Sequence, residues 1–193
     1  WATANPGFAL ARGSALPDEY PTVPCEGYKG KGVKLETLST GFFGEIMNRP
    51  LASGNLFLGE FDISTALTET LRSTHFGLPF KQKPLEFSGW FKYIPGEKMQ
   101  DATGKIMEGI EDQGTVYAIL YRNHDKEGNK IVLYGDNVQT SEHIVARAIM
   151  DTSGTTNEWT HFHVRFNYEA EMDYDLLLNN GYSLAIVASS SIQ

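Results

Sequence analysis

Cysteine is nearly absent from this chain of 193 residues, which contains only Cys25. A lone cysteine excludes a scaffold held together by intrachain disulfides and a cysteine-rich zinc site. Positive charge is also scarce, because 16 basic residues against 24 acidic ones give a formal net charge of −8. Proteins that bind nucleic acid usually present a basic face to the phosphates, so this charge balance argues against a nucleic-acid partner.

Long hydrophobic runs are missing as well. The longest uncharged stretch, residues 176–193, is interrupted by Asn179, Asn180 and Gly181 and runs into three serines, so it predicts no transmembrane helix. A basic segment followed by an apolar one, typical of a signal peptide, is not visible, and we expect any such segment to lie outside this chain. Phosphate-binding glycine loops and the H-E-x-x-H zinc motif are also absent.

Glycine and aromatic residues, in contrast, are abundant. The chain has 19 glycines, and 12% of its residues are aromatic, a composition that favours strands joined by turns over helices. Hydrophobic residues make up 41% of the chain, which is enough to build a core. No linker separates segments of different composition, so we expect one domain over residues 1–193.

Short segments rich in β-branched and aromatic residues, bounded by turn-forming residues, predict the strands. They cover residues 32–38, 55–61, 85–93, 115–122, 131–134, 159–168 and 182–188. Residues 131–134 are expected to pair with 115–122 as a hairpin, and residues 143–150 fit a helix or a strand, of which we favour the strand. Residues 1–31, rich in proline and glycine, are expected to be an extended loop. Seven or more strands predict an all-β fold, a jelly-roll β-sandwich.

The predicted strands also separate an apolar face from a polar, ring-bearing face. In residues 159–168, phenylalanine and valine alternate with histidine and arginine, and residues 85–93 and 115–122 alternate in a similar way. The polar faces of the three strands are expected to form one outward surface. That surface would consist of Trp90, Tyr117, Tyr121, Trp159, His161, His163 and Arg165, together with Glu86 and Lys92.

Such a surface suits a sugar, because aromatic rings stack on sugar C–H faces and charged donors bind the hydroxyls. The stacking rings would be Trp90, Tyr117 and Tyr121, and the polar groups would be His161, His163 and Arg165. The alternative is an ordinary solvated face of an antiparallel sheet, without a ligand.

Motifs for metal binding and catalysis are incomplete. His161 and His163 would point the same way from a strand, as a metal pair does, but no third ligand follows at a recognisable spacing. Residues 60–65, E-F-D-I-S-T, resemble the start of the E-x-D-x-x-E signature of jelly-roll glycoside hydrolases, yet Thr65 stands where the general acid should be. Because that chemistry requires two carboxylates, Asp62 is expected to be a turn or capping residue instead.

Two further interpretations stay open at this point. Asp173 and Asp175 could bind a structural calcium ion, although a solvated acidic loop is the favoured interpretation, and no other cofactor is predicted. Histidine, arginine and tyrosine on a concave sheet also resemble the active sites of jelly-roll polysaccharide lyases. In those enzymes a histidine or tyrosine abstracts a proton while arginine neutralises a uronate carboxylate.

Six segments carry a resemblance to a known family. They are Trp1–Phe8, Gly32–Thr37, Ser53–Gly59, Phe87–Tyr93, Trp159–Val164 and Tyr182–Ser190. In combination they resemble the PCMD family, the "putative carbohydrate metabolism domain", over residues 1–191. The resemblance implies a jelly-roll β-sandwich similar to carbohydrate-binding modules, in secreted or lipid-anchored surface proteins of glycan-degrading gut bacteria. It implies no catalytic residues.

From the residues and this resemblance we predict a non-catalytic domain that binds an extracellular polysaccharide or glycoconjugate. We expect the protein outside the cell or on the outer-membrane surface. The first alternative is a polysaccharide lyase or glycoside hydrolase, which would hold an acid and a base together in a deep cleft. The second alternative is a structural adhesin-type module without a sugar site.

Overall fold

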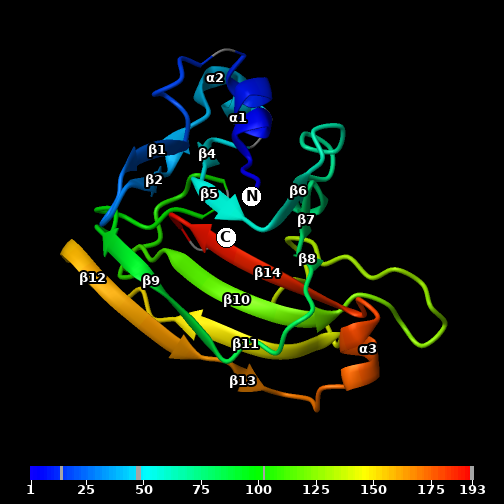
Figure 1. Cartoon of the computed structure of the whole chain (residues 1–193). Helices are drawn as coiled ribbons and strands as arrows, with labels where there is room; N and C mark the ends of the chain where they lie inside the picture. The colour runs from blue at the N-terminus through cyan, green and yellow to red at the C-terminus, as the bar shows by residue number, and fades with distance from the viewer. Residues whose placement is uncertain (14, 47–48, 102, 192–193) are drawn as a thin grey trace.

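The computed structural model describes residues 1–13, 15–46, 49–101 and 103–191. Most of its regular structure is β, and its helices are short (Figure 1). The helical elements are α1 Asn5–Arg12, α2 Gly41–Ile46, α3 Tyr174–Leu178 and the 3-10 turn Thr70–Arg72. This composition of elements confirms the prediction of an all-β fold.

Helix α1 lies in the segment predicted to be an extended loop, so that prediction is wrong for residues 5–12. Pro6 occupies the first turn, where its missing N–H costs no helical hydrogen bond, and Gly13 ends the helix with a left-handed φ of 82°. Phe8 is buried on the inner side of the helix and contacts the ring of Tyr20, with ring centroids 6.0 Å apart. The proline and glycine that suggest a loop therefore begin and end a short helix.

The main sheet has the strand order β13–β11–β10–β14–β5, and β8 also pairs with β14. Its strands are β5 Asn55–Phe57, β8 Leu78–Pro79, β10 Thr115–Arg122, β11 Ile144–Met150, β13 Asn167–Tyr168 and β14 Tyr182–Ser189. Strand β11 confirms the strand favoured for residues 143–150. Residues 131–134, in contrast, form no strand, because β11 and β14 already occupy both edges of β10. Only a single bridge joins Leu133 to Phe76.

A two-stranded antiparallel ribbon, β9 (Glu86–Tyr93) with β12 (Thr156–Arg165), forms the second layer. Strand β12 runs almost directly into β13, which pairs with β11, so the ribbon joins the edge of the main sheet (Figure 1). Phe166 and Tyr168 then pack against the buried side chains of the main sheet. The ribbon and the main sheet together make the all-β sandwich.

Three smaller pairs of strands complete the sheet structure. They are β1 Thr22–Glu26 with β2 Lys31–Leu35, β3 Leu38–Ser39 with β4 Leu51–Ala52, and β6 Gly59–Phe61 with β7 Thr74–Phe76. The base of the β1–β2 hairpin is held by two backbone hydrogen bonds, from Glu36 N to Pro21 O at 2.8 Å and from Gly54 N to Glu36 O at 2.9 Å. The tip of this hairpin reaches the β9–β12 ribbon.

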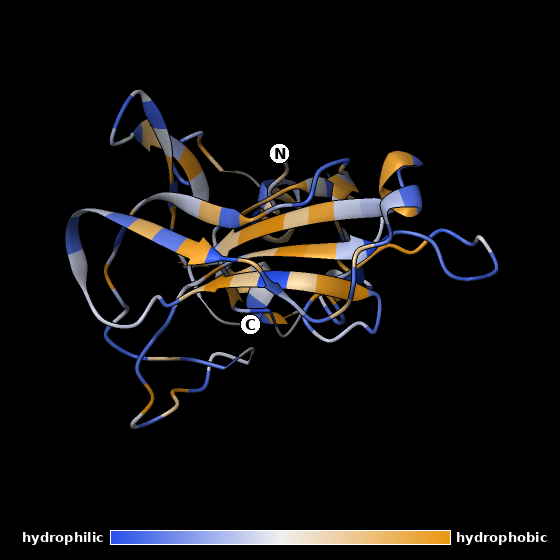
Figure 2. Ribbon diagram, turned by 60° about the horizontal axis from the view of Figure 1, so that its bottom comes forward, coloured by the Kyte–Doolittle hydropathy of each residue, from blue (hydrophilic) through white to orange (hydrophobic). Residues whose placement is uncertain are grey.

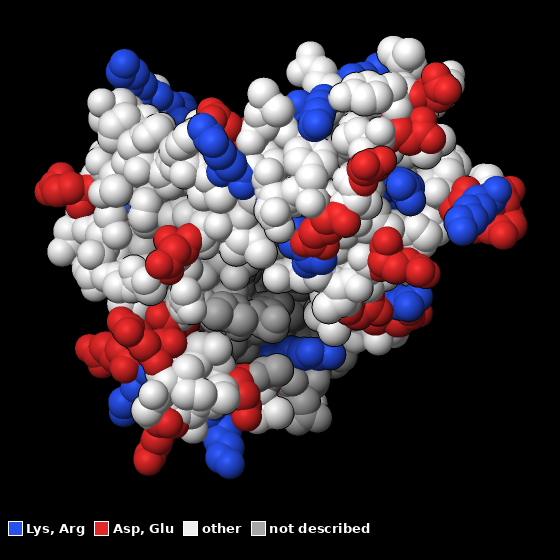
Figure 3. All heavy atoms as spheres, turned by 90° about the horizontal axis from the view of Figure 1, so that it is seen from below, with Lys and Arg blue, Asp and Glu red and all other residues white. Residues whose placement is uncertain are grey.

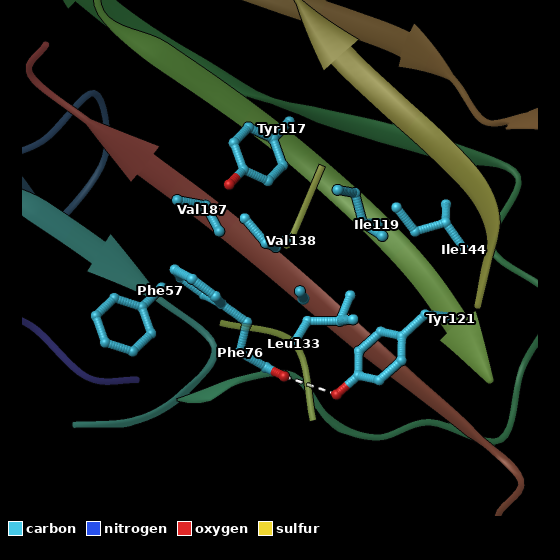
Figure 4. Packing of buried hydrophobic residues seen from close by; sticks show 10 residues of the cluster. Phe57, Phe76, Tyr117, Ile119, Tyr121, Leu133, Val138, Ile144 and Val187 are labelled. Atoms are coloured by element: carbon cyan, nitrogen blue, oxygen red, sulfur yellow. Dashed lines mark hydrogen bonds between the residues drawn. The ribbon is translucent and has the colours of Figure 1, made fainter. Parts of the chain in front are cut away.

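The larger core cluster covers one face of the main sheet, and Figure 4 shows its packing. It consists of Phe57, Phe76, Tyr117, Ile119, Tyr121, Leu133, Val138, Ile144, Ala185 and Val187. A second cluster contains Leu120, Val145, Ala146, Leu177 and Tyr182. Strand β10 contributes to both clusters and is therefore buried on both sides.

Tyr117 and Tyr121 belong to the larger cluster, so their predicted position on the outward surface is wrong. Their side chains are only 4% and 2% exposed, and the Tyr121 hydroxyl donates to the carbonyl oxygen of Phe76 at 2.7 Å (Figure 4). Burial of the phenol raises the pKa of Tyr117 to about 12, because the phenolate would lose its hydration. Alternation cannot identify an outward face on a strand that has none.

Two acidic residues singled out from the sequence have local structural roles. Asp62 accepts hydrogen bonds from the backbone N and the hydroxyl of Ser64, at 2.9 Å and 2.6 Å, which confirms the prediction of a turn residue. Asp173 caps helix α3 by accepting from the backbone N of Asp175 at 2.9 Å and of Leu176 at 3.1 Å.

Hydropathy and charge are distributed as expected for a protein in water. Figure 2 shows hydrophobic residues running along the strands, whereas the loops are largely hydrophilic. On the face seen in Figure 3, acidic and basic side chains are interspersed. Among the described residues, no helix is both long and apolar enough to span a membrane.

Candidate functional site

Strands β9 and β12 place four of the six predicted site residues on one outward face. Their antiparallel register pairs Trp90 with His161 and Glu86 with Arg165, and His163 lies between these two pairs. The apolar residues that alternate with them are half-buried on the other side of the ribbon, namely Phe87, Phe91, Phe162 and Val164. The predicted alternation is therefore confirmed for residues 86–93 and 161–165. Tyr117 and Tyr121 are not part of the face.

One end of this face carries a charged cluster. His163 Nε2 donates to Glu86 Oε2 at 2.9 Å, and Arg165 Nε lies 3.8 Å from Glu86 Oε1. The hydrogen bond from His163 is the main cause that holds the pKa of Glu86 below its ordinary value of 4.5. Because the cluster is exposed to water, it adds little to the stability of the fold. It does present a carboxylate and several donors to a polar ligand.

Replacing His163 with alanine is expected to raise the pKa of Glu86 toward 4.5, because its main stabilising hydrogen bond is lost. The depressed pKa means that the Glu86 carboxylate stabilises the fold at pH values above its unfolded-state pKa, and this contribution disappears as the pH falls through the folded-state pKa. NMR titration of the side-chain carboxyl carbons measures the change. An Arg165→Ala variant is the matched control and should shift the pKa less. An unchanged pKa in His163→Ala would show that the hydrogen bond does not form in solution.

The other end of the face carries an aromatic stack that the sequence did not reveal. Tyr28, at the tip of the β1–β2 hairpin, stacks on Trp90 with ring centroids 3.7 Å apart and ring planes 10° apart. The imidazole of His161 lies 5.1 Å from the Trp90 ring. Both rings of the stack keep more than two-fifths of their surface exposed. The only sequence signal for Tyr28 was an aromatic residue between turn glycines, Gly27 and Gly30.

A groove with a volume of about 430 Å³ opens between the hairpin and the ribbon. It is lined by Gly27, Tyr28, Lys29, Lys31, Gly32, Trp90 and Trp159. The ammonium group of Lys29 lies 5.8 Å from the Tyr28 ring centroid, and that of Lys92 lies 5.5 Å from the Trp159 ring centroid. The groove therefore combines three rings with positively charged groups, which suits a ligand that has both flat apolar faces and polar substituents.

Metal ligation is not what organises this face. His161 contacts the Trp90 ring and His163 binds Glu86. Within the described ranges of the chain, no three His, Cys, Asp or Glu side chains lie close enough together to hold a metal ion. The geometry thus offers stacking surfaces and hydrogen-bonding groups.

Among the solved structures that are similar to this chain over nearly its full length, two are each named a "putative glycoside hydrolase". The one from Bacteroides thetaiotaomicron is 38% identical with a TM-score of 0.92, and the match covers 100% of this chain and 56% of that one. The one from Bacteroides vulgatus is 35% identical with a TM-score of 0.87, and the match covers 98% of this chain and 75% of that one. The chain thus spans little more than half the length of the first of these proteins.

The family comparison covers the full sequence. No protein with curated annotation shows a significant match to this chain. The family described as "putative carbohydrate metabolism domain", in contrast, matches residues 1–193. This match shows that the chain belongs to the putative carbohydrate metabolism domain family.

Proposed function

We propose that the protein binds a polysaccharide or glycoconjugate, without cleaving it, in the groove between the β1–β2 hairpin and the β9–β12 ribbon. The observation that carries the proposal is the exposed stack of Tyr28 on Trp90 at the wall of a groove that Trp159 also lines. Exposed rings cost free energy in water unless a ligand covers them, and sugar rings have apolar faces that do so. Membership of a carbohydrate-related family agrees with a ligand of this kind.

The positions of the carboxylates favour binding over hydrolysis. The ribbon has two acidic residues, Glu86 and Glu158. Glu86 pairs with Arg165, whereas Glu158 lies in the irregular part of β12 opposite residues 91–93, five to seven residues farther along β9, so at ~3.3 Å per residue the two acids are about 17–23 Å apart. Glycosidic hydrolysis needs two carboxylates roughly 5–9.5 Å apart. The ribbon by itself therefore cannot supply the pair.

Hydrolysis or lyase chemistry is the competing function, because both similar structures carry the name of a glycoside hydrolase. The Glu86, His163 and Arg165 cluster could serve as a proton-transfer group beside a charge neutraliser. The two functions differ in what happens to the glycan. An enzyme releases new sugar ends, whereas a binding domain retains the glycan unchanged.

The polysaccharide or glycoconjugate of this proposal is an extracellular one. The proposal therefore places the protein outside the cell or on the outer-membrane surface, as a component of glycan capture. Exposure of the intact source cells to a protease that cannot enter them tests this location, because a surface protein is degraded and an internal one is protected.

Trp90→Ala and Tyr28→Ala are expected to weaken glycan binding by roughly 5- to 150-fold, the equivalent of the ~1–3 kcal/mol found for one stacked ring in nucleic-acid binding. The measurement is a glycan array with neutral and acidic saccharides, followed by titration of the best ligand and a reducing-end and unsaturated-product assay. The free energy of unfolding of each variant should lie within about 1.5 kcal/mol of that of the unaltered protein, since only the exposed ring stack is lost.

Tyr174→Ala is the matched control, because Tyr174 is an exposed aromatic residue of helix α3, on the opposite side of the molecule from the β1–β2 hairpin (Figure 1). It should bind as the unaltered protein does. Release of new sugar ends would replace the binding proposal with an enzymatic function. Absence of any glycan binding would leave the structural adhesin and overturn the proposal.

A further inference from the structure

We propose that the groove selects negatively charged saccharides, those that carry carboxylate or sulfate groups. This inference rests on the proposed glycan binding and names the class of glycan. Its basis is the chemistry of the groove lining. Lys29, Lys31, Trp90 and Trp159 have side chains that only donate hydrogen bonds, and Tyr28 alone both donates and accepts.

Lining side chains that donate but hardly accept suit one kind of ligand group. Sugar hydroxyls donate as well as accept, so a site for neutral sugars is best built from a mixture of donors and acceptors. Carboxylate and sulfate oxygens only accept, and they form the stronger, charge-assisted hydrogen bonds with ammonium groups. The groove has no acidic side chain among its lining residues, which would repel such a ligand.

Two of the ammonium groups near the groove are not neutralised. Lys29 and Lys92 have no ion-pair partner among the residues that the structure describes, although both lie over aromatic rings. Lys31 differs, because its ammonium group pairs with Glu26 at 2.5 Å. The free charges of Lys29 and Lys92 therefore lie beside Tyr28 and Trp159, where the edge substituents of a stacked sugar would be found.

The net charge of the whole chain opposes the binding of an anionic glycan. With a formal net charge of −8, the protein as a whole repels polyanions. Non-specific attraction therefore does not explain affinity for an anionic glycan, which has to come from a local site. Because the lysines are exposed, added salt should weaken the interaction.

The test compares glycans that share a backbone and differ in charge. The probes are polygalacturonate against its methyl ester and dextran sulfate against dextran, titrated calorimetrically into the full chain. The first pair reports on carboxylates and the second on sulfates. Affinity for a charged member at least tenfold above that for its neutral counterpart supports the proposal. Equal or stronger binding of the neutral members, or binding of none of the four probes, overturns it.

Lys29→Gln combined with Lys92→Gln is expected to lower the affinity for the charged glycan by about two- to thirtyfold, the sum of two exposed charge contacts. Lys126→Gln combined with Lys130→Gln is the matched control. These two exposed lysines belong to the loop after β10, which lies far from the β1–β2 hairpin (Figure 1). Equal losses in both double variants would show a non-specific charge effect and overturn the proposal.

The outcome is separable from that of the proposed function. If the array shows binding only to neutral glycans, and Trp90→Ala weakens it, glycan binding stands while charge selection fails. If no glycan binds at all, the proposed function fails, and charge selection fails with it.

Discussion

Tyr121→Ala is expected to lower the free energy of unfolding by about 3–5 kcal/mol, the usual cost of deleting a buried aromatic ring. The Tyr121 side chain is 2% exposed and belongs to the larger core cluster, and the deletion would leave a cavity between β10 and the segments that cover it. The lost hydroxyl would also leave the carbonyl oxygen of Phe76 without its partner at 2.7 Å. Urea unfolding followed by tryptophan fluorescence measures the loss.

Two variants separate the causes of this effect. Tyr121→Phe keeps the ring and removes only the hydroxyl, so it should cost about 0.5–1.5 kcal/mol. Trp90→Ala removes an even larger ring, but one that is 42% exposed, and it should cost less than Tyr121→Ala. If Tyr121→Ala instead weakened glycan binding while the free energy of unfolding stayed unchanged, Tyr121 would be a surface residue after all.

Gly77→Ala is the second substitution with a large expected effect, about 2–5 kcal/mol of lost stability. Gly77 has a φ of 99°, a backbone conformation that residues with a Cβ rarely adopt. A Cβ at this position would also lie 2.6 Å from the Tyr121 hydroxyl oxygen, and the buried ring has no room to move away. Backbone strain and overpacking therefore act together, and thermal or urea unfolding measures their sum.

Gly128→Ala is the matched control for backbone strain. Gly128 has a similar φ of 86°, but no atom lies within 4 Å of a Cβ built there, so only the strain of about 1–2 kcal/mol should appear. A double variant, Gly77→Ala with Tyr121→Ala, should lose less stability than the two single losses added together, because the clash needs both side chains. Strict additivity would show that the ring and Gly77 are not in contact.

The contrast between Tyr121 and Trp90 shows how far alternation along a strand can be trusted. The pattern in β9 and β12 correctly separated half-buried phenylalanines from exposed rings and charges, because one face of that ribbon meets the core and the other meets water. The same pattern in β10 has no such meaning. Strand β10 is central in its sheet and covered on both faces, so tyrosine on either side is buried.

Two predictions of secondary structure were wrong because the same residues are compatible with more than one structure. The abundance of proline and glycine in residues 1–31 indicates a loop. The positions of Pro6 and Gly13, however, are those at which an eight-residue helix begins and ends, and they bound helix α1. Residues 131–134, isoleucine and valine followed by leucine and tyrosine, indicate a strand, but no free edge of β10 is left to receive it. The spacing of proline and glycine decides the first case, and strands that are distant in sequence decide the second.

The sequence by itself determined the all-β class, most of the strands, the outward alternation of Trp90, His161, His163 and Arg165, and the family. These features depend on residue type and on a period of two residues, which a single segment already contains. Only the tertiary structure decided that Tyr28 stacks on Trp90 and that the β1–β2 hairpin, with Lys29 at its tip, closes a groove beside Trp159. Those contacts join segments about 60 and 130 residues apart, and chain packing rather than local pattern brings such segments together.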